Sequence, residues 1–263
     1  MLKIIVCIKQ VPNTDNVQFD WKKGALVRKG IENITNPDGL HAIEQALAIK
    51  EQYESHITAI TMGPPQAEET LREAYALGVD NCVLITDKRF AGSDTYITSK
   101  ILHKAIKHLG NFDIVITGFE TLDGGTSQVS YQLAEFFDIP HFTQVDRLEI
   151  SGTSVIIQRL YGHEYQKVKT DLPMLIAVKK ELNSVRHARL IDIKVSFDKK
   201  ITILNMEDIG GSAEEYGFSA SPTKTLEGEV VRHKRKQERF EGTSVEKIEK
   251  LVGKLKKYGI IKY

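Results

Sequence analysis

Short apolar runs alternate with amphipathic stretches along the first half of the chain. The runs are rich in β-branched residues, which is typical of buried strands, and they occupy residues 3–8, 56–62, 81–87 and 113–118. The helices expected between them, from apolar residues that recur with the helical period, cover residues 39–53, 65–78 and 93–110. Strands that alternate with helices predict a mostly parallel sheet with helices on both of its faces.

The pattern changes after Ile139. The segments "VDRLEI", "SVIIQRLY" and "EYQKVKT" are separated by short Gly-containing links, and this predicts a small antiparallel meander. Residues 173–180 form another apolar run, which we expect to return to the main sheet as a strand.

The pattern of apolar and polar residues changes again in the C-terminal part of the chain. Residues 205–242 show no sustained period and are interrupted by glycines and a proline, so we expect an arm that folds onto a second subunit. Residues 243–259 carry an apolar stripe, and Thr243 and Glu246 stand at capping-box spacing, which predicts a terminal amphipathic helix. The expected domains are therefore 1–204, an α/β nucleotide-binding domain, and 205–263, an arm and helix that pack on a partner.

Composition narrows the class of protein. The 263 residues suffice for one large domain and a small extension, and no apolar run approaches the roughly 20 residues of a membrane span. The beginning of the sequence lacks a secretory signal pattern, so a cytoplasmic location is expected. A formal net charge of +1 argues against nucleic acid as the main partner.

The metal-binding residue types are sparse. Cys7 and Cys82 are the two cysteines, each lies within an apolar run, and both are expected to be buried and reduced. Two cysteines cannot hold a four-cysteine iron–sulfur cluster, and the histidines lack metal-binding spacing. We therefore predict no metal site.

The loops that follow the strands carry glycines beside hydroxyl and amide residues. In an open parallel sheet such loops meet at the carboxyl ends of the strands, where ligands bind. Three features of these loops suit a phosphate. They are the N-termini of the helices, the glycines that let the backbone approach closely, and the hydroxyls of Thr95, Thr98, Thr126 and Ser127. Each loop alone is also explained by ordinary turn chemistry. Neither a GxGxxG after the first strand nor a Walker A motif is present.

No catalytic group stands out in the sequence. The chain has no GxSxG motif, and no nucleophile–histidine pairing is indicated. Asp94, Glu120 and Asp123 are compatible with a carboxylate cluster, but loop capping explains each of them as well. The residues by themselves thus predict a nucleotide-binding α/β domain without acid–base machinery, joined to an arm suited to a partner.

Six ordered segments carry a family resemblance. They are "VCIKQVPNT", "NPDG", "MGPPQAEETLREAYALGVD", "FAGSDTYITSKIL", "GFETLDGGTSQV" and "SPTKT". With these segments the chain resembles the beta subunit of electron transfer flavoproteins over essentially its full length. The resemblance implies a flavodoxin-like α/β fold and a heterodimer in which a C-terminal arm surrounds the alpha subunit.

The family contains two kinds of beta subunit. Simple members hold AMP, whereas bifurcating members hold a second FAD that receives electrons from NADH. The segment "FAGSDTYITS" is typical of the bifurcating group, so the resemblance implies FAD, with AMP as the alternative and a non-redox adenine-nucleotide-binding protein as a remote one. The implied cofactor-binding residues are Cys7, Asn36, Pro37, Asp38, Met62, Gly63, Ser93, Asp94, Thr95, Thr98, Gly118, Glu120, Thr121, Asp123, Gly124, Gly125, Thr126, Ser127, Gln128 and Val129.

The resemblance also implies partners and a role. The expected role is electron bifurcation, or the reverse flow, between NADH, ferredoxin or flavodoxin, and a flavin dehydrogenase that acts on acyl-CoA or lactate. Departures from the family pattern leave the choice of dehydrogenase open. They comprise Glu120, Thr121, Gly125, Ser130, Tyr131 and Val185.

Overall fold

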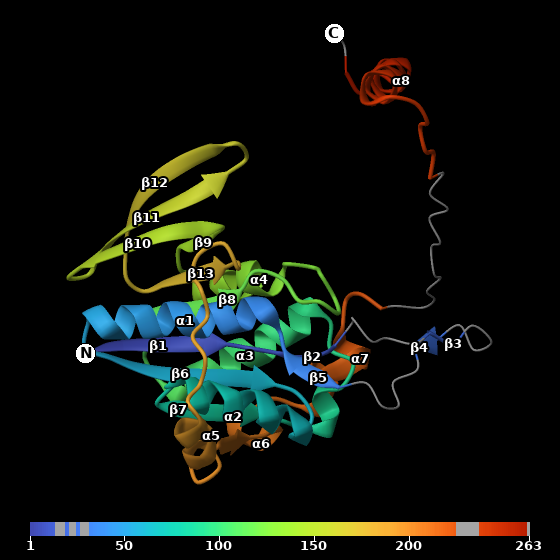
Figure 1. Cartoon of the computed structure of the whole chain (residues 1–263). Coiled ribbons are helices and arrows are strands. Elements are labelled where there is room, and N and C mark those ends of the chain that lie inside the picture. The colour runs from blue at the N-terminus through green and yellow to red at the C-terminus, as the bar shows by residue number, and fades with distance from the viewer. Residues whose placement is uncertain (14–18, 21–24, 27–31, 225–236, 262–263) are drawn as a thin grey trace. The chain divides into compact units, whose positions relative to one another are not determined.

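The computed structural model describes residues 1–13, 19–20, 25–26, 32–224 and 237–261. The chain divides into two compact units, Met1–Leu226 and Glu227–Tyr263. The first contains the sheet, and the second contains one long helix (Figure 1).

In the described part of the first unit, the main sheet has seven strands. Their order is β14-β7-β6-β1-β8-β13-β9, and each pairing between neighbouring strands is parallel. The chain runs outward from β1 through β6 to β7 and then crosses back to β8 on the other side of β1. The strands are β1 (Leu2–Cys7), β6 (Ser55–Met62), β7 (Asn81–Ile85), β8 (Ile114–Gly118), β9 (His141–Thr143), β13 (Met174–Val178) and β14 (Thr202–Leu204).

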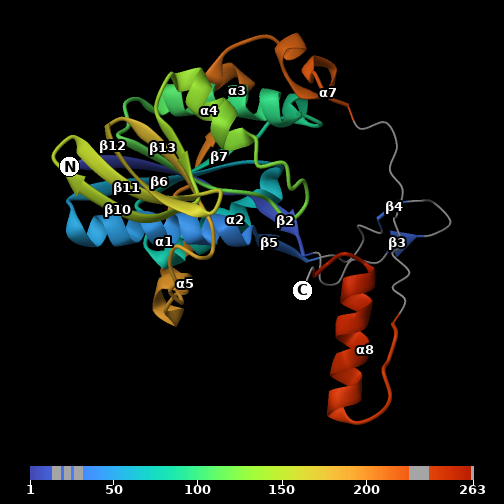
Figure 2. The same cartoon turned by 90° about the horizontal axis from the view of Figure 1, so that it is seen from above.

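Helices cover both faces of this sheet, as the sequence predicts. Figure 2 shows α1 (Pro37–Gln52) and α2 (Glu68–Leu77) on one side and α3 (Thr95–Leu109) and α4 (Val129–Phe137) on the other. Alternate residues of the strands supply two separate cores, so that Ile4 and Val6 face α1 whereas Ile5 faces α3. This alternation explains why the strands read as continuous apolar runs. Two short 3₁₀ helices, η2 (Pro65–Ala67) and η3 (Lys88–Phe90), precede α2 and α3.

The antiparallel meander is confirmed. Strands β10 (Val145–Ser151), β11 (Ser154–Tyr161) and β12 (Glu164–Asp171) pair in that order. Val155 and Ile157 on β11 are buried in the core that contains α1, while Ile156 between them is exposed. Two small antiparallel pairs lie earlier in the chain: β2 (Gln10–Pro12) with β5 (Asn33–Thr35), and β3 (Phe19–Asp20) with β4 (Ala25–Leu26).

The stretch from 190 to 224 is more regular than the sequence indicates. It contains α5 (Leu190–Ser196), β14, α6 (Met206–Ile209), η4 (Ala213–Glu215) and α7 (Gly217–Ala220). Met206, Ile209 and Tyr216 are buried in the core beside α3, so residues 205–224 belong to the first unit. The first unit ends at Leu226, which lies later in the chain than the expected domain boundary between residues 204 and 205. Packing of the later residues on a partner stays a prediction.

The second unit contains α8 (Ser244–Lys257). The Thr243 hydroxyl accepts a hydrogen bond from the Glu246 backbone, and the Glu246 carboxylate accepts one from the Thr243 backbone, which confirms the capping box. Its apolar stripe of Val245, Ile248 and Leu251 is exposed in this single chain. Among the described helices, none combines the length and the apolar character needed to cross a membrane.

Candidate functional site

The predicted site residues lie where the central strands end. Cys7 ends β1, Met62 ends β6 and is followed by Gly63, and Gly118 ends β8. The sheet order changes direction at β1, which is flanked by β6 and β8, and ligands of open parallel sheets bind at such a point. We call the segments 7–10, 36–38, 62–64, 86–98 and 118–129, together, the carboxyl edge.

The first turn of α1 is bonded to the loop that follows β8. Asn36 is buried; its Nδ2 donates to the Glu120 carbonyl at 2.8 Å, and its Oδ1 accepts from the Leu122 amide at 3.0 Å. The Asp38 carboxylate accepts from the Glu120 amide at 3.2 Å. Burial raises the pKa of Asp38 more than this donor lowers it. The structure thus brings segments 36–38 and 118–122 together, as a shared site requires.

The same loop is fixed to β1 through a residue that the sequence reading missed. Lys9 Nζ lies 2.6 and 2.9 Å from the two carboxylate oxygens of Asp123, and the Gly124 amide donates to Asp123 at 2.8 Å. Burial opposes ionisation of Asp123, but the Lys9 ammonium, together with hydrogen bonds from Thr121 and Gly124, outweighs it and lowers the pKa of Asp123. Asp123 therefore anchors the loop. Lys9 directly follows the apolar run 3–8, and this position at the end of a predicted strand is the signal in the sequence that could have identified it.

Two residues of this loop have left-handed backbone conformations. Gly125 has a φ of +56° and Ser127 a φ of +54°. The Gly125 amide donates to the Thr121 carbonyl at 2.9 Å, which closes the turn. A non-glycine residue in this region is uncommon and tends to occur at ligand sites. Residues 122–126 are exposed and therefore accessible to a ligand.

The N-termini of α3 and α4 are joined by side chains. The Thr95 hydroxyl donates to Gln128 Oε1 at 3.0 Å and accepts from Gln132 Nε2 at 3.2 Å. Ser99, fully buried one turn later, donates to the Thr95 carbonyl at 2.7 Å. The N-terminus of each helix carries a partial positive charge, and these hydrogen bonds hold the two N-termini next to each other. Gln132 was not among the predicted residues.

Buried hydroxyls at this end of the fold have no hydrogen-bond partner among the described residues. They include the hydroxyls of Thr117, immediately before Gly118, and Ser130, in the first turn of α4. Buried polar groups are normally paired, so these two favour a polar ligand or water beside them. Together with the exposed glycine loop and the paired helix ends, they fit a nucleotide that carries phosphate.

Other predicted residues form hydrogen bonds that stabilise a loop or a helix end of this chain. Ser93 donates to the Phe90 carbonyl at 2.7 Å, and Asp94 caps α3 by accepting from the Ile97 amide at 3.0 Å. Asp94 and Asp123 are each bonded to separate segments, which favours loop capping over a shared carboxylate cluster. Burial raises the pKa of Cys7 to about 12, so this thiol is neutral at pH 7.

A cavity of about 380 Å³ lies beside the carboxyl edge, on the side of α1 and α2. Glu69 and Glu73 contribute to its lining, and Pro37 is the one predicted site residue among those that line it. Two carboxylates repel phosphate, so this cavity does not suit a nucleotide phosphate. Among the described residues, no three His, Cys, Asp or Glu side chains gather into a possible metal site.

The sequence comparisons all indicate the same protein family. Residues 23–204 match the model of the electron transfer flavoprotein domain. The chain is 40% identical to the electron transfer flavoprotein subunit beta of Thermoanaerobacterium thermosaccharolyticum, over 99% of this chain and 100% of that one. It is 39% identical to the caffeyl-CoA reductase-Etf complex subunit CarD of Acetobacterium woodii, over 99% and 100%. It is 36% identical to the acryloyl-CoA reductase electron transfer subunit gamma of Anaerotignum propionicum, again over 99% and 100%.

Proposed function

Because this chain belongs to the family of electron transfer flavoprotein beta subunits, we propose that its carboxyl edge binds FAD and that the subunit takes part in electron bifurcation with NADH. In this proposal the other participants are the alpha subunit, ferredoxin or flavodoxin, and a flavin dehydrogenase. Relatives named as subunits of CoA-ester reductase complexes support an acyl-CoA dehydrogenase over a lactate dehydrogenase.

The paired N-termini of α3 and α4 carry the proposal. AMP has one phosphate, and one helix end with a glycine loop suffices to hold it. The diphosphate of FAD carries more negative charge, and two helix ends held together by Thr95, Gln128 and Gln132 suit it better. This observation favours FAD over a structural AMP.

The residues of this chain would bind and orient the cofactor. Asn36 and Asp38 would face its adenosine, and residues 124–128 its phosphates. Ser93, Thr95 and Thr98, at the N-terminus of α3, would contact the diphosphate and the ribityl chain. Bound FAD supplies hydride acceptance and single-electron transfer. Lys9 keeps the loop closed through Asp123, and the Cys7 thiol adds no charge to the site.

Flavin stoichiometry tests the proposal directly. Purified with its alpha subunit, the protein should contain two FAD per heterodimer, measured by absorbance after release from denatured protein against total amino acids. One FAD together with one AMP, identified by mass spectrometry of the released nucleotides, would establish the alternative. Absence of any bound or bindable adenine nucleotide would contradict both assignments.

An exposed apolar helix supports a protein partner. On α5, Leu190 is 84% exposed, Ile191 57% and, directly after the helix, Phe197 68%. Arg72 on α2 holds the end of this helix, since it donates to the carbonyls of Ser196 at 2.7 Å and Lys199 at 2.5 Å. Exposed apolar groups held on a rigid support are typical of interaction sites. We assign this face to the dehydrogenase.

Leu190→Glu should weaken binding to the dehydrogenase about tenfold, since loss of one buried leucine contact is worth roughly 1.5 kcal/mol or more. The measurement is the concentration dependence of electron transfer to the dehydrogenase. Tyr165→Glu is the matched control, because Tyr165 is 67% exposed but lies on β12 of the meander. Equal effects of the two substitutions, or loss of flavin in Leu190→Glu, would contradict this assignment.

A further inference from the structure

The segment 205–224 contacts the loop between β7 and α3 at several places. This loop, residues 86–94, leads into the N-terminus of α3 and carries Ser93. Three of these contacts, at Asp87, Phe90 and Asp94, are spread along the length of the loop.

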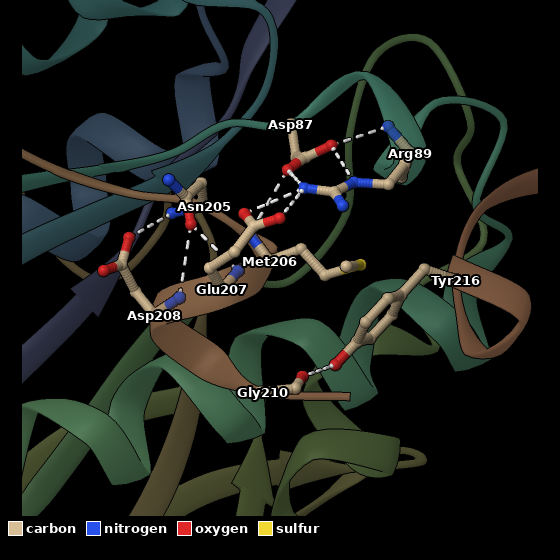
Figure 3. Close-up of polar contacts among 8 residues, drawn as sticks. All are labelled: Asp87, Arg89, Asn205, Met206, Glu207, Asp208, Gly210 and Tyr216. Atoms are coloured by element: carbon tan, nitrogen blue, oxygen red, sulfur yellow. Dashed lines mark hydrogen bonds and ion pairs between the residues drawn. The ribbon is translucent and has the colours of Figure 1, made fainter. Parts of the chain in front are cut away.

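The first contact is an ion-pair network around Asp87 (Figure 3). The Asp87 carboxylate accepts from Arg89 Nε at 2.8 Å and Nη2 at 2.6 Å, and from the Met206 amide at 3.3 Å. Arg89 Nη2 also lies 2.7 Å from Glu207. The Asn205 side chain accepts from the Glu207 and Asp208 amides and thereby caps α6. The start of the loop is thus bound to α6.

The second contact is apolar. Tyr216 is 1% exposed, and its ring packs edge-on against Phe90 with 5.2 Å between centroids. Its hydroxyl accepts from Lys104 Nζ at 2.8 Å and donates to the Gly210 carbonyl (Figure 3). This hydroxyl is satisfied on both sides, and the middle of the loop rests on a fixed ring.

The third contact occupies the carboxylate of Asp94. One oxygen accepts from the Ile97 amide, and the other accepts from the Thr223 amide at 2.9 Å and the Thr223 hydroxyl at 2.8 Å. The Asp94 amide donates to the buried Ser221 hydroxyl at 2.9 Å. Groups of this chain therefore satisfy the carboxylate on both oxygens. Its neighbours Ser93 and Thr95 remain at the candidate site.

We propose that Asp94 is a positioning residue rather than a ligand of the nucleotide, and that Thr223, acting through Asp94, holds Ser93 and Thr95 in their binding positions. This inference rests on the nucleotide site proposed above. Without Thr223, the loop would have to be ordered when the nucleotide binds, and that cost would lower affinity. By linkage, bound nucleotide must in turn strengthen the hold on residues 221–224.

The test is a double-mutant cycle on the full chain with its alpha subunit. Asp94→Asn keeps an acceptor for capping α3, since asparagine is a good N-cap, but its amide nitrogen cannot accept from Thr223. Thr223→Val removes the hydroxyl and keeps the shape of the side chain. Thr223→Ser keeps the hydroxyl and is the control. Dissociation constants for FAD and for AMP are measured in each variant by calorimetry.

Each single substitution should weaken nucleotide binding about tenfold, the effect of losing one hydrogen bond to a charged group. The double variant should bind no more weakly than the weaker single variant, and Thr223→Ser should match the wild type. Hydrogen exchange gives a second readout that a purely structural role would not move. Added nucleotide should slow exchange of the Thr223 amide in the wild type, and Thr223→Val should abolish this slowing.

Two results would overturn the inference while leaving the nucleotide site intact. Wild-type affinity in Thr223→Val would show that Thr223 has no influence, and additive losses in the double variant would show that Asp94 acts separately from it. If Asp94→Asn fails to fold, the nucleotide affinity and the hydrogen exchange of Thr223→Val still test the inference. A wild-type protein that binds neither FAD nor AMP would reject the proposed function and this inference with it.

Discussion

Gly118→Ala is expected to lower the free energy of unfolding by about 2 kcal/mol, which is typical of an overpacked site, and to weaken nucleotide binding at the same time. A methyl group at Gly118 would lie 2.8 Å from Cβ of Asp38, 3.0 Å from its carbonyl carbon and 3.1 Å from the Gly39 nitrogen. Two of these atoms are backbone in the first turn of α1 and cannot rotate away. The turn must shift, and the Asn36 hydrogen bonds to Glu120 and Leu122 shift with it.

Urea unfolding and nucleotide titration of the same variant measure the two effects. Gly253→Ala is the control, because Gly253 lies in α8 with no other group within 4 Å of the added methyl. Alanine there should leave stability unchanged or raise it by up to about 1 kcal/mol. Normal nucleotide affinity in Gly118→Ala would mean that the α1 turn is not part of the site.

Gly125→Val is expected to abolish nucleotide binding while the fold survives. Gly125 has a φ of +56°, a conformation in which a β-branched residue is a severe outlier. The residue is exposed, and the nearest atom to an added Cβ is the Thr121 carbonyl oxygen at 3.9 Å, so crowding within the protein is slight. The strain should instead deform the loop between Asp123 and Ser127. Melting temperature and flavin content, measured on one preparation, report the two outcomes.

Gly124→Ala separates strain from contact with the ligand. Its φ is not positive, and an added methyl would touch only the Thr121 hydroxyl, at 3.5 Å, which is ordinary contact. A loss of affinity in this variant therefore reports that the nucleotide occupies the space beside the loop. Full affinity in both glycine variants, with a lower melting temperature, would show that the segment is only a turn.

Most of the first unit could be predicted because each element carries its own signal. The alternation of apolar and polar residues suffices for the parallel strands and their helices, and Gly78 and Gly110 do end α2 and α3 at their C-caps. The strand order is not contained in any one segment. It follows from the pairing of β1 with both β6 and β8, which depends on the whole chain.

The elements that were missed are short. Helix α6 spans four residues and β14 three, too few to show a period. The spacing of Asn205 and Asp208, and of Ser212 and Glu215, is that of a capping box, and this local signal was present in the sequence. Helix α5 was hidden for another reason: its exposed apolar side chains break the expected division into buried and polar faces.

The candidate site was foreseen as a set of loops but not as a network. Segments 36–38 and 118–128 do lie together, and this convergence follows from parallel topology alone. The contacts of Lys9 with Asp123, of Thr95 with Gln132 and of Asp94 with Thr223 join residues distant in sequence. Long-range pairs of polar side chains leave no periodic trace, so they could not be read from one chain.

The position of β14 also has a consequence for biosynthesis. This strand pairs with β7 through Thr202 to Leu204, opposite Val83 to Ile85, and it closes one edge of the sheet. A ribosome reaches β14 long after it has completed β7 and the central strands. The nascent chain therefore carries an open sheet edge for much of its synthesis, during which pairing with a neighbouring chain competes with folding.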